Sequence, residues 1–526
     1  MRVAQKRTGK TQSARTLSTP APIGGLNARD ALAAMPPNDA VTLDNFFPTP
    51  TSVNLRNGYT NWVTGFSTHV ESLMPYNKPN GSSSLFAAAG TAIYDATSQG
   101  AVGAAVVSGQ TNARWQHVNY GTTGGQYLVA VNGADAPQLY NGTAWQAVTA
   151  VSAPIAITGV TASTFIHVNV YKNRLYFIPK DSLTVWYMPV NSLGGAASQL
   201  DLTPLFRLGG YLMAMATWTI DNAAGVAEYA VFISSQGEVV LYSGSDPSSS
   251  TEWNIVATFR VGRPVGRRCF VKVGSDLIIL GADGFYPLSR ALLTDRSQSQ
   301  DAISNKIVNL VSNDVQNYGA NFGWEAVLHP IGSKLIVNVP QAANATQYQY
   351  VQNTISGAWC RFTGWNANCF AVMGDALYFG GNLGATANSA YVAKADTGYS
   401  DNGAYIFGEV KTAFQYFGKT GQLKHMKMVR PVFSVAGTMS AVIGIDMDFA
   451  DKYPEGTPTF SGSAGTAWNV GAWNSFAWGD ASTVKKDWQG VTGIGYAAAL
   501  HMRIVNNQSY VQWQSIDYVF ELGGVL

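Results

Sequence analysis

The chain contains little charge and little cysteine for its length. Only 12% of its 526 residues are Asp, Glu, Lys or Arg, about half the share in an average soluble protein. The three cysteines are too few and too scattered for a disulfide framework or a CxxC metal site, so we expect buried thiols and folding under reducing conditions; they are Cys269, Cys360 and Cys369. No segment reaches the roughly 18 apolar residues that a membrane-spanning helix needs.

Motifs for catalysis and metal binding are equally scarce. The histidines show no HExxH spacing, and the Gly-Lys-Thr strings at 9–11 and 418–420 lack the upstream glycine of a phosphate-binding loop. The acidic stretch that begins at Asp446 has Ala450 and Thr457 where a calcium loop needs ligands. We therefore predict no catalytic residue, no cofactor, no metal and no enzymatic activity.

Basic residues are concentrated at the start of the chain. Of 33 basic residues, five lie in the first fifteen positions, which leaves 28 against 31 acidic residues and a net charge of −3 for the rest. The body thus lacks the basic surface that binds nucleic acid. Residues 1–22 are also rich in Ser, Thr and Pro, which predicts a flexible arm. Its basic residues are Arg2, Lys6, Arg7, Lys10 and Arg15.

A short phrase, a turn followed by about five strand-forming residues, recurs seven times. The copies begin at Gly90, Gly124, Lys172, Gln236, Gly274, Gly332 and Gly374. Their spacing varies from 34 to 64 residues, around the roughly 40 to 50 residues of a four-stranded propeller blade. The pattern predicts an all-β fold in which residues 23–400 form a β-propeller of roughly six to eight irregular blades, with an N-terminal extension.

Two segments carry helix signals. Between Asp301, a candidate cap, and Gly319, a candidate stop, apolar residues recur at helical spacing, which predicts one inserted amphipathic helix packed on the propeller or on a neighbouring subunit. Asn27 before a polar stretch that ends at Pro36 predicts a second, short helix.

Strand patterns lengthen after Ala404, and residues 401–526 read as a second β domain, a sandwich or platform, with a turn at 505–510 between its last two strands. One loop in this domain contains three tryptophans that form either an interaction patch or part of the core: Trp468, Trp473 and Trp478.

The body contains one basic cluster, on a loop with interspersed Gly and Pro: Arg260, Arg263, Arg267, Arg268 and Lys272. We expect either a solvated loop or a contact with another subunit or with DNA. The stretch from Ser243 to Trp253 is similar to the Asp-box turn of sialidases, but Ser248 replaces its glycine, which favours a plain blade hairpin with a turn at Asp246.

Residues 21–59, beginning APIGGLNARDALAAMPP, resemble the opening of the tail nozzle proteins of short-tailed bacteriophages, also called tail tubular protein B or tail hub proteins. The resemblance continues through 262–290, 348–372 and the final SIDYVFELGGVL at 515–526. It covers most of the chain from about residue 21 onward, and its motifs include no catalytic residue.

The resemblance implies a structural subunit of the virion tail, assembled in the host cytoplasm: a propeller plus a platform domain, with six copies forming a ring-shaped nozzle through which DNA is ejected. Its implied partners are further copies of itself, the head-tail adaptor, tail fibres or tailspikes, and DNA in transit. The net charge of −3 suits a conduit that does not hold DNA. Candidate partner-binding residues are the five basic residues of the arm, Arg263, Arg267, Arg268 and the three tryptophans.

A second reading remains open. The chain is then a receptor- or glycan-binding propeller, with or without glycan hydrolase activity, that uses Trp468, Trp473 and Trp478 as stacking platforms. A propeller module of non-viral origin is a third possibility.

Overall fold

The computed structural model describes residues 14–78, 81–222, 225–291, 302–436, 438–452, 454, 459–461 and 483–523. The chain divides into two compact units. The propeller unit comprises residues 58–357 and 362–397, and the sandwich unit comprises residues 1–57, 358–361 and 398–526.

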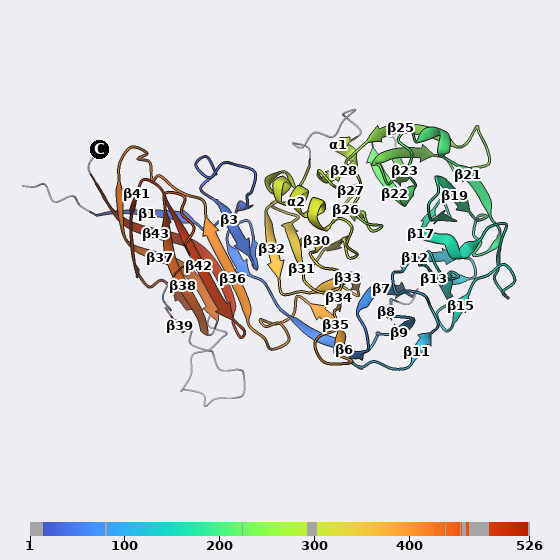
Figure 1. Cartoon of the computed structure of the whole chain (residues 1–526), viewed down its shortest axis with the longest axis horizontal. Helices are drawn as coiled ribbons and strands as arrows, with labels where there is room; N and C mark the ends of the chain where they lie inside the picture. The colour runs from blue at the N-terminus through green and yellow to red at the C-terminus, as the bar shows by residue number, and fades with distance from the viewer. Residues whose placement is uncertain are drawn as a thin grey trace, which may run out of the picture. The chain divides into compact units, whose positions relative to one another are not determined.

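The propeller unit contains seven β-sheets that act as blades in the part of the chain that the structure describes, and Figure 1 shows them arranged in a ring. A propeller fold was predicted and is confirmed, and seven blades fall within the predicted range. The innermost strands of neighbouring blades contact one another. β7 (Val70–Asn77) contacts β33 (Ala367–Met373) and β12 (Gln116–Thr122), and β17 (Phe165–Tyr171) contacts β12 and β22 (Leu212–Asn222). β29 (Glu325–His329) contacts β26 (Phe270–Val273) and β33.

The first four blades have the following strands. Blade 1 contains β6 (Tyr59–Phe66), β33 (Ala367–Met373), β34 (Ala376–Gly381) and β35 (Ala390–Ala395), with β10 (Gly100–Ala101) beside β6. Blade 2 contains β7 (Val70–Asn77), β8 (Ser83–Ala89), β9 (Ala92–Asp95) and β11 (Ala105–Val107). Blade 3 contains β12 (Gln116–Thr122), β13 (Gly125–Val131), β14 (Gln138–Tyr140) and β15 (Trp145–Ala147). Blade 4 contains β17 (Phe165–Tyr171), β18 (Arg174–Pro179), β19 (Thr184–Tyr187) and β21 (Ser198–Asp201).

The remaining blades follow in chain order. Blade 5 contains β22 (Leu212–Asn222), β23 (Gly225–Ser234), β24 (Glu238–Ser243) and β25 (Asn254–Arg260). Blade 6 contains β26 (Phe270–Val273), β27 (Asp276–Gly281) and β28 (Gly284–Pro287), followed by α1 (Leu288–Ala291). Blade 7 contains β29 (Glu325–His329), β30 (Lys334–Pro340) and β31 (Gln347–Asn353). A small ladder pairs β16 (Ile157–Thr158) with β20 (Gly195–Ala196), and short 3-10 turns lie at η1 (Ala162–Thr164) and η2 (Thr203–Leu205).

The repeated phrase of the sequence marks one hairpin in every blade. Its seven copies lie in or lead into β9, β13, β18, β24, β27, β30 and β34. The turn between β17 and β18 shows why: Lys172 and Asn173 both have positive φ, 46° and 55°. A two-residue turn of this kind twists the two strands in the sense that the sheet requires.

The apolar core is divided among the gaps between neighbouring blades. One cluster joins Tyr171 and Tyr176 of blade 4 to Phe232 and Tyr242 of blade 5, all nearly inaccessible to water. Blades 2, 3 and 4 each bury both of their faces in this way, because burial of apolar area, worth about 25 cal/mol per Å², needs a covering sheet on either side.

Blade 1 closes the ring. It combines β6 from the start of the propeller unit with three strands from its end, and Val63 of β6 pairs with Val392 of β35 in an antiparallel register. This pairing leaves no free edge at the junction, so the first and last parts of the unit hold each other in place.

The predicted amphipathic helix is present but shorter. It consists of a 3-10 turn, η4 (Asn305–Ile307), and the helix α2 (Val308–Tyr318), with Gly319 directly after it. The helix contacts β28 and β30, and Tyr350 donates a 2.5 Å hydrogen bond to Asp314, so it packs on its own propeller. The predicted cap, Asp301, lies outside the described residues.

The sandwich unit consists of two facing β-sheets, and the fold predicted for the C-terminal domain is confirmed. The first sheet contains β1 (Arg15–Pro20), β4 (Phe46–Pro48), β5 (Val53–Leu55), β37 (Lys424–Ala436), β40 (Thr483–Lys485), β41 (Gln489–Gly495) and β43 (Tyr510–Leu522). The second contains β2 (Gly25–Leu26), β3 (Asp39–Asp44), β36 (Ile406–Thr412), β38 (Thr438–Met447), β39 (Thr459–Ser461) and β42 (Ala498–Asn506). The chain passes from propeller to sandwich and back through β32 (Trp359–Thr363).

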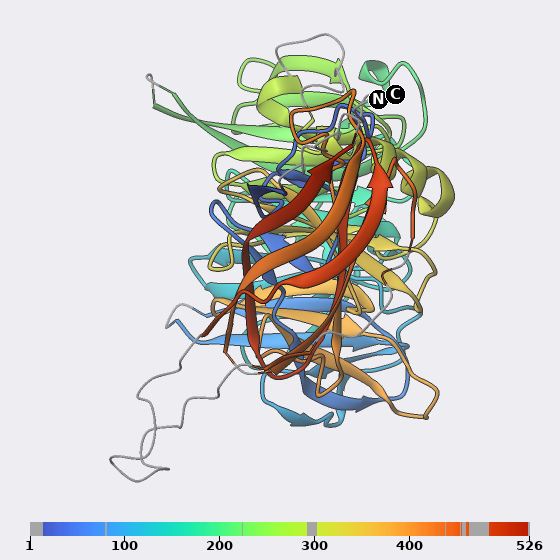
Figure 2. The ribbon, with the colours of Figure 1, turned by 90° about the vertical axis from the view of Figure 1, so that its left-hand side faces the viewer.

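The two sheets pack closely enough to require a glycine. A Cβ atom on Gly408 of β36 would lie 2.5 Å from the ring of Phe46 in the other sheet. The Trp513 ring packs edge-on against the Phe46 ring, with ring centroids 6.4 Å apart. Figure 2 shows the long strands of this unit, in orange and red, facing the viewer. The predicted turn at 505–510 lies between β42 and β43.

Three expectations about the N-terminal region differ from the structure. Residues 23–57, which were assigned to the propeller, belong to the sandwich unit because β3, β4 and β5 pair with strands of its two sheets. The end of the predicted flexible arm forms β1, since the edge of β43 offers it backbone partners, with Arg15 opposite Phe520. Asn27 does accept hydrogen bonds from two downstream amides, but its side chain also donates to Asp39, and turns replace the predicted helix.

Candidate functional site

The propeller unit contains a hollow of about 650 Å³ between its blades. Its wall comes from blades 2, 3, 6 and 7, where the innermost strands begin. We call it the axial hollow and define it by Glu71, Arg114, Asn132, Arg267, Arg268 and Phe322. A deeper cavity of about 270 Å³ shares Gln116, Arg267 and Arg268 with it and extends toward His117 and His167.

Arg268 joins several blades at the base of the axial hollow. Its guanidinium is 3.0 Å from the Glu325 carboxylate and donates to the Ser72 hydroxyl (2.8 Å) and to the carbonyls of Glu71 and Trp115. Glu325 in turn accepts a 3.0 Å bond from the amide of Phe370. The pair therefore connects blades 1, 2, 3, 6 and 7. Burial raises the pKa of Glu325, an effect that Arg268 opposes.

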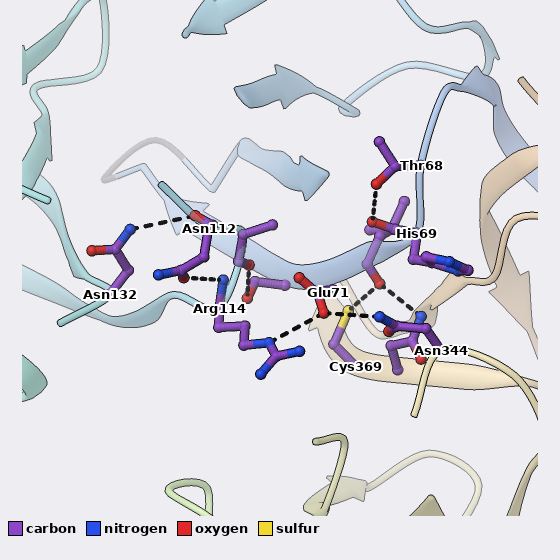
Figure 3. Close-up of polar contacts among 12 residues, drawn as sticks. Thr68, His69, Glu71, Asn112, Arg114, Asn132, Asn344 and Cys369 are labelled. Carbon is purple, nitrogen blue, oxygen red and sulfur yellow. Dashed lines mark hydrogen bonds and ion pairs between the residues drawn. The ribbon is translucent and has the colours of Figure 1, made fainter. Parts of the chain in front are cut away.

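Arg114 lines the axial hollow, and its side chain is directed toward Glu71 (Figure 3). Its Nε atom lies 3.2 Å from Glu71, and its guanidinium stands 4.4 Å from the centre of the Phe322 ring. The Glu71 carboxylate is also bonded by Asn344 at 3.2 Å. The Arg268 guanidinium lies 5.5 Å from the centre of the same ring, so two guanidinium groups are close enough to Phe322 for cation–π interactions.

The loop at the rim is held by its own polar groups. The Asn132 side chain donates to Asp135 (2.6 Å) and to the Asn112 carbonyl (3.3 Å), and it accepts from the amides of Ala134 and Asp135. Asp135 also accepts two 2.7 Å bonds from Thr111. Burial by itself would raise the pKa of Asp135, but the hydrogen bonds that it accepts together outweigh burial and lower the pKa. The rim is thus fixed before any ligand enters.

Arg267 differs from the other two arginines. Its side chain is exposed to the hollow, and within the described residues its guanidinium has neither a carboxylate within ion-pair distance nor a hydrogen-bond acceptor. A Cβ atom on Gly133 would lie 3.5 Å from its Nη1, which places the guanidinium beside the rim. Surrounding protein lowers the pKa of Arg267 through partial loss of hydration. Among the arginines of the axial hollow, Arg267 is therefore the one without a carboxylate partner within the described residues.

The deeper cavity contains neutral imidazoles. Burial, reinforced by the charge of Arg268, lowers the pKa of His117 to about 4, and burial likewise lowers the pKa of His167 to about 4. The His167 Nε2 atom lies 2.8 Å from the Met215 carbonyl, which makes it the protonated nitrogen. Lys272 also lines this cavity and is exposed, so the positive charge of the two cavities comes from arginine and lysine.

The sandwich unit holds the one group of metal-ligand type among the described residues. Oxygen or nitrogen atoms of Asp446, Asp451 and His501 lie within 4.8 Å of one another. The Lys411 ammonium, however, is 2.9 Å from both carboxylates and occupies the position that a cation would take. We therefore describe this group as an ion-pair network.

The predicted partner-binding residues have different positions. Arg267 and Arg268 line the axial hollow, Arg263 is exposed outside it, and Arg15 is exposed on β1. The remaining basic residues of the arm, Arg2, Lys6, Arg7 and Lys10, and the three tryptophans, Trp468, Trp473 and Trp478, lie outside the described residues.

Sequence reasoning missed Glu71, Arg114, Phe322 and Glu325. Their common signal is weak: the two carboxylates sit at the start of an innermost strand and the other two just before one. That position is recognisable only once the blades have been assigned. The interpretation of Ser243–Trp253 as a hairpin agrees with its place between β24 and β25, where Asp246 caps the turn through Ser248.

No family model matches the chain, and no curated protein matches it. Solved structures do resemble it in fold. A chain of the BBS1N–ARL6DN complex is 11% identical, with a TM-score of 0.38, over 66% of this chain and 99% of that one. An exo-beta-1,3-galactanase from Phanerochaete chrysosporium is 10% identical, with a TM-score of 0.24, over 77% and 95%. A glycoside hydrolase family 43 arabinoxylan arabinofuranohydrolase from Bacillus subtilis is 10% identical, with a TM-score of 0.25, over 94% and 96%.

One sequence-based expectation is corrected here. We predicted that the chain is not an enzyme, and the presence of two glycoside hydrolases among the similar structures contradicts that prediction. At this level of identity the similarity concerns the fold, and it transfers no catalytic residue. Among the described residues, no helix has the length and apolar character needed to cross a membrane.

Proposed function

We propose that the chain is a receptor- or glycan-binding β-propeller whose axial hollow takes part of a saccharide. The observation that carries the proposal is the hollow itself, which has a volume of about 650 Å³ and is lined by guanidinium, amide and hydroxyl groups. Its volume lies within the roughly 300–1,000 Å³ of small-molecule sites.

The lining favours recognition through hydrogen bonds. Thr91, Asn112 and Gln116 supply neutral donors and acceptors, and Arg267 supplies up to five N–H donors. Trp324 is only 2% exposed, and its indole nitrogen already donates to Tyr318. Arg114 and Arg268 lie beside the Phe322 ring, so this ring is not available for stacking on a sugar. The described part of the hollow therefore binds sugar hydroxyl groups through polar side chains rather than through an aromatic ring.

A variant that fills the hollow tests the proposal. Ala134 is exposed and lines the hollow, whereas Ala144 is exposed in the same blade outside it. We expect Ala134→Trp to abolish binding on a glycan array and Ala144→Trp to leave it unchanged. A chain that binds no saccharide, or equal binding by both variants, would contradict the proposal. A reducing-sugar assay on the bound glycans tests hydrolysis, which one carboxylate substitution should then remove.

A second function is favoured by a different observation. Two stretches that carry the resemblance to phage tail nozzle proteins, 21–59 and 515–526, come from opposite ends of the chain and contribute strands to one sheet. In this sheet β43 pairs with β5 through Gln512 and Trp513, just before the second stretch. We propose on this basis that the sandwich unit is the assembly domain of a tail subunit. The sparse charge of the chain also suits a subunit covered by its neighbours.

Electron microscopy of the purified chain, alone and with the head-tail adaptor of its virus, tests this second proposal. Rings of six copies are expected, as the resemblance implies. Removal of residues 1–13, which leaves β1 intact, should weaken attachment to the adaptor without changing the fold. A chain that remains monomeric with the adaptor present would refute this role.

A further inference from the structure

The axial hollow carries a net positive charge in a chain whose remainder does not. Four cationic side chains, Arg114, Arg267, Arg268 and Lys272, and two anionic ones, Glu71 and Glu325, line the hollow and its deeper extension. Beyond its first fifteen residues the chain has a net charge of −3. The positive hollow is therefore a local feature of these inner-strand residues rather than a reflection of composition.

The charges of the other two arginines are already matched. Arg268 is paired with Glu325 and donates to three further acceptors, and Arg114 is paired with Glu71. Both carboxylates of the hollow are thus used in structural pairs. Neither is free to neutralise Arg267.

Arg267 lacks such a partner. The acidic groups whose charge acts on it are Asp181 and Tyr211, and neither lies within ion-pair or hydrogen-bond distance of its guanidinium. An unpaired guanidinium inside a hollow has lost part of its hydration without a compensating bond, which favours an anionic ligand over a neutral one. The neutral histidines of the deeper cavity add no competing charge.

We propose that Arg267 makes the axial hollow selective for a ligand that bears a carboxylate or a phosphate group. This inference rests on the proposed function in naming a saccharide as the ligand. The planar guanidinium binds either oxyanion through two parallel hydrogen bonds. Asn132 and its neighbours fix the rim beside Arg267, so the anion enters a site that is already formed.

The matched control comes from the same basic cluster. Arg263 lies four positions earlier, is exposed, and does not line the hollow. Arg267→Gln and Arg263→Gln remove the same charge from the chain. A difference in ligand affinity between the two variants therefore measures the effect of the charge inside the hollow. Circular dichroism and thermal unfolding test whether both variants are folded.

Isothermal titration calorimetry with paired probes tests the proposal. Sialyllactose against lactose reports on a carboxylate, and glucose 6-phosphate against glucose reports on a phosphate. We expect one acidic probe to bind roughly tenfold to a hundredfold more tightly than its neutral counterpart. Arg267→Gln should remove that preference, and Arg263→Gln should keep it.

The outcomes separate the two proposals. Equal binding of acidic and neutral sugars, or a preference that survives Arg267→Gln, overturns the anion selectivity while leaving saccharide binding intact. Binding of inorganic phosphate that depends on Arg267, with no binding of any sugar, overturns the glycan function and retains the anion site. No binding of any probe overturns both.

Discussion

Arg268 and Glu325 form a buried ion pair that joins the blades of the propeller at its centre. Their Nη1 and Oε2 atoms are 3.0 Å apart, and the two side chains are only 12% and 15% exposed. Because their other bonds reach Ser72 in blade 2, Trp115 before blade 3 and Phe370 in blade 1, the pair acts on packing between blades.

Removal of one partner should destabilise the propeller strongly. Glu325→Ala leaves the Arg268 charge buried without its partner, and such a change costs about 3–5 kcal/mol. Replacement of both residues, as in Arg268→Met with Glu325→Leu, should cost less than the single change because no charge is left uncompensated. Urea unfolding of the three variants measures these differences. A loss below about 1 kcal/mol for Glu325→Ala would show that the pair is dispensable.

The network around His501 predicts a pH-dependent stability of the sandwich unit. Burial by itself would lower the pKa of His501, but the bond to Glu409 and the charges of Asp446 and Glu409 outweigh it, and Lys411 opposes them, so the pKa is raised. The bond from His501 lowers the pKa of Glu409. Arg503 also faces Glu409, at 3.8 Å.

The direction of the pH dependence of stability follows from these pKa shifts. A raised pKa of His501 contributes stability that is fully present below its unfolded value of 6.5 and is lost as the pH rises through the folded value. The contribution of Glu409 is present above 4.5 and is lost as the pH falls. We expect His501→Gln to reduce the free energy of unfolding by about 1–3 kcal/mol near about pH 6 and by less near about pH 9. Equal losses at both pH values would argue against a charged His501.

Gly380 in β34 has no room for a side chain. A Cβ atom there would lie 2.6 Å from Cys369 Sγ and 2.7 Å from the Val70 carbonyl. Gly380→Ala should therefore destabilise the propeller by about 1–3 kcal/mol, since backbone and buried sulfur must move. Gly103→Ala is the matched control: its Cβ would meet no atom within 4 Å, and a change within about 0.5 kcal/mol is expected. Thermal unfolding followed by circular dichroism compares the two.

The cysteines should be unreactive in the folded protein. All three are buried, and burial raises the pKa of Cys269 to about 12 and raises that of Cys369 as well. Because the thiolate is the reactive form, a thiol reagent at about pH 8 should label no cysteine until the protein is unfolded, when it should label three. Rapid labelling of any cysteine under native conditions would contradict the packing described for the blades.

Local signals in the sequence predicted the hairpins but not the closure of the ring. The turn at Lys172 and Asn173 depends only on its own residues, and the same holds for the other copies of the phrase. The pairing of Val63 with Val392 depends on the arrangement of all the blades between them, which no local pattern encodes. Tertiary context also explains Asn27, whose capping bonds form while its bond to Asp39 draws it into a turn.

For the same reason, spacing alone could not distinguish the positions of two of the five residues in the basic cluster. Spacing alone placed Arg267 and Arg268 on a loop that we expected to be solvated or to contact a partner, and the structure shows both at the axial hollow. The two arginines are adjacent in the sequence but differ in their contacts. Arg268 is paired with Glu325 and donates to three further acceptors, whereas Arg267 has no carboxylate partner among the described residues. Only the positions of Glu71, Trp115 and Glu325 distinguish them.

Blade 1 combines strands from both ends of the propeller unit, so it can be completed only at the end of translation of that unit. β6 leaves the ribosome first among the strands of the propeller unit, but its antiparallel partner, β35, is made last. Throughout translation of the six blades between them, β6 has an unpaired edge that can recruit other strands. A nascent chain interrupted before Ala390 can never satisfy that edge, so premature termination should yield aggregates rather than smaller propellers.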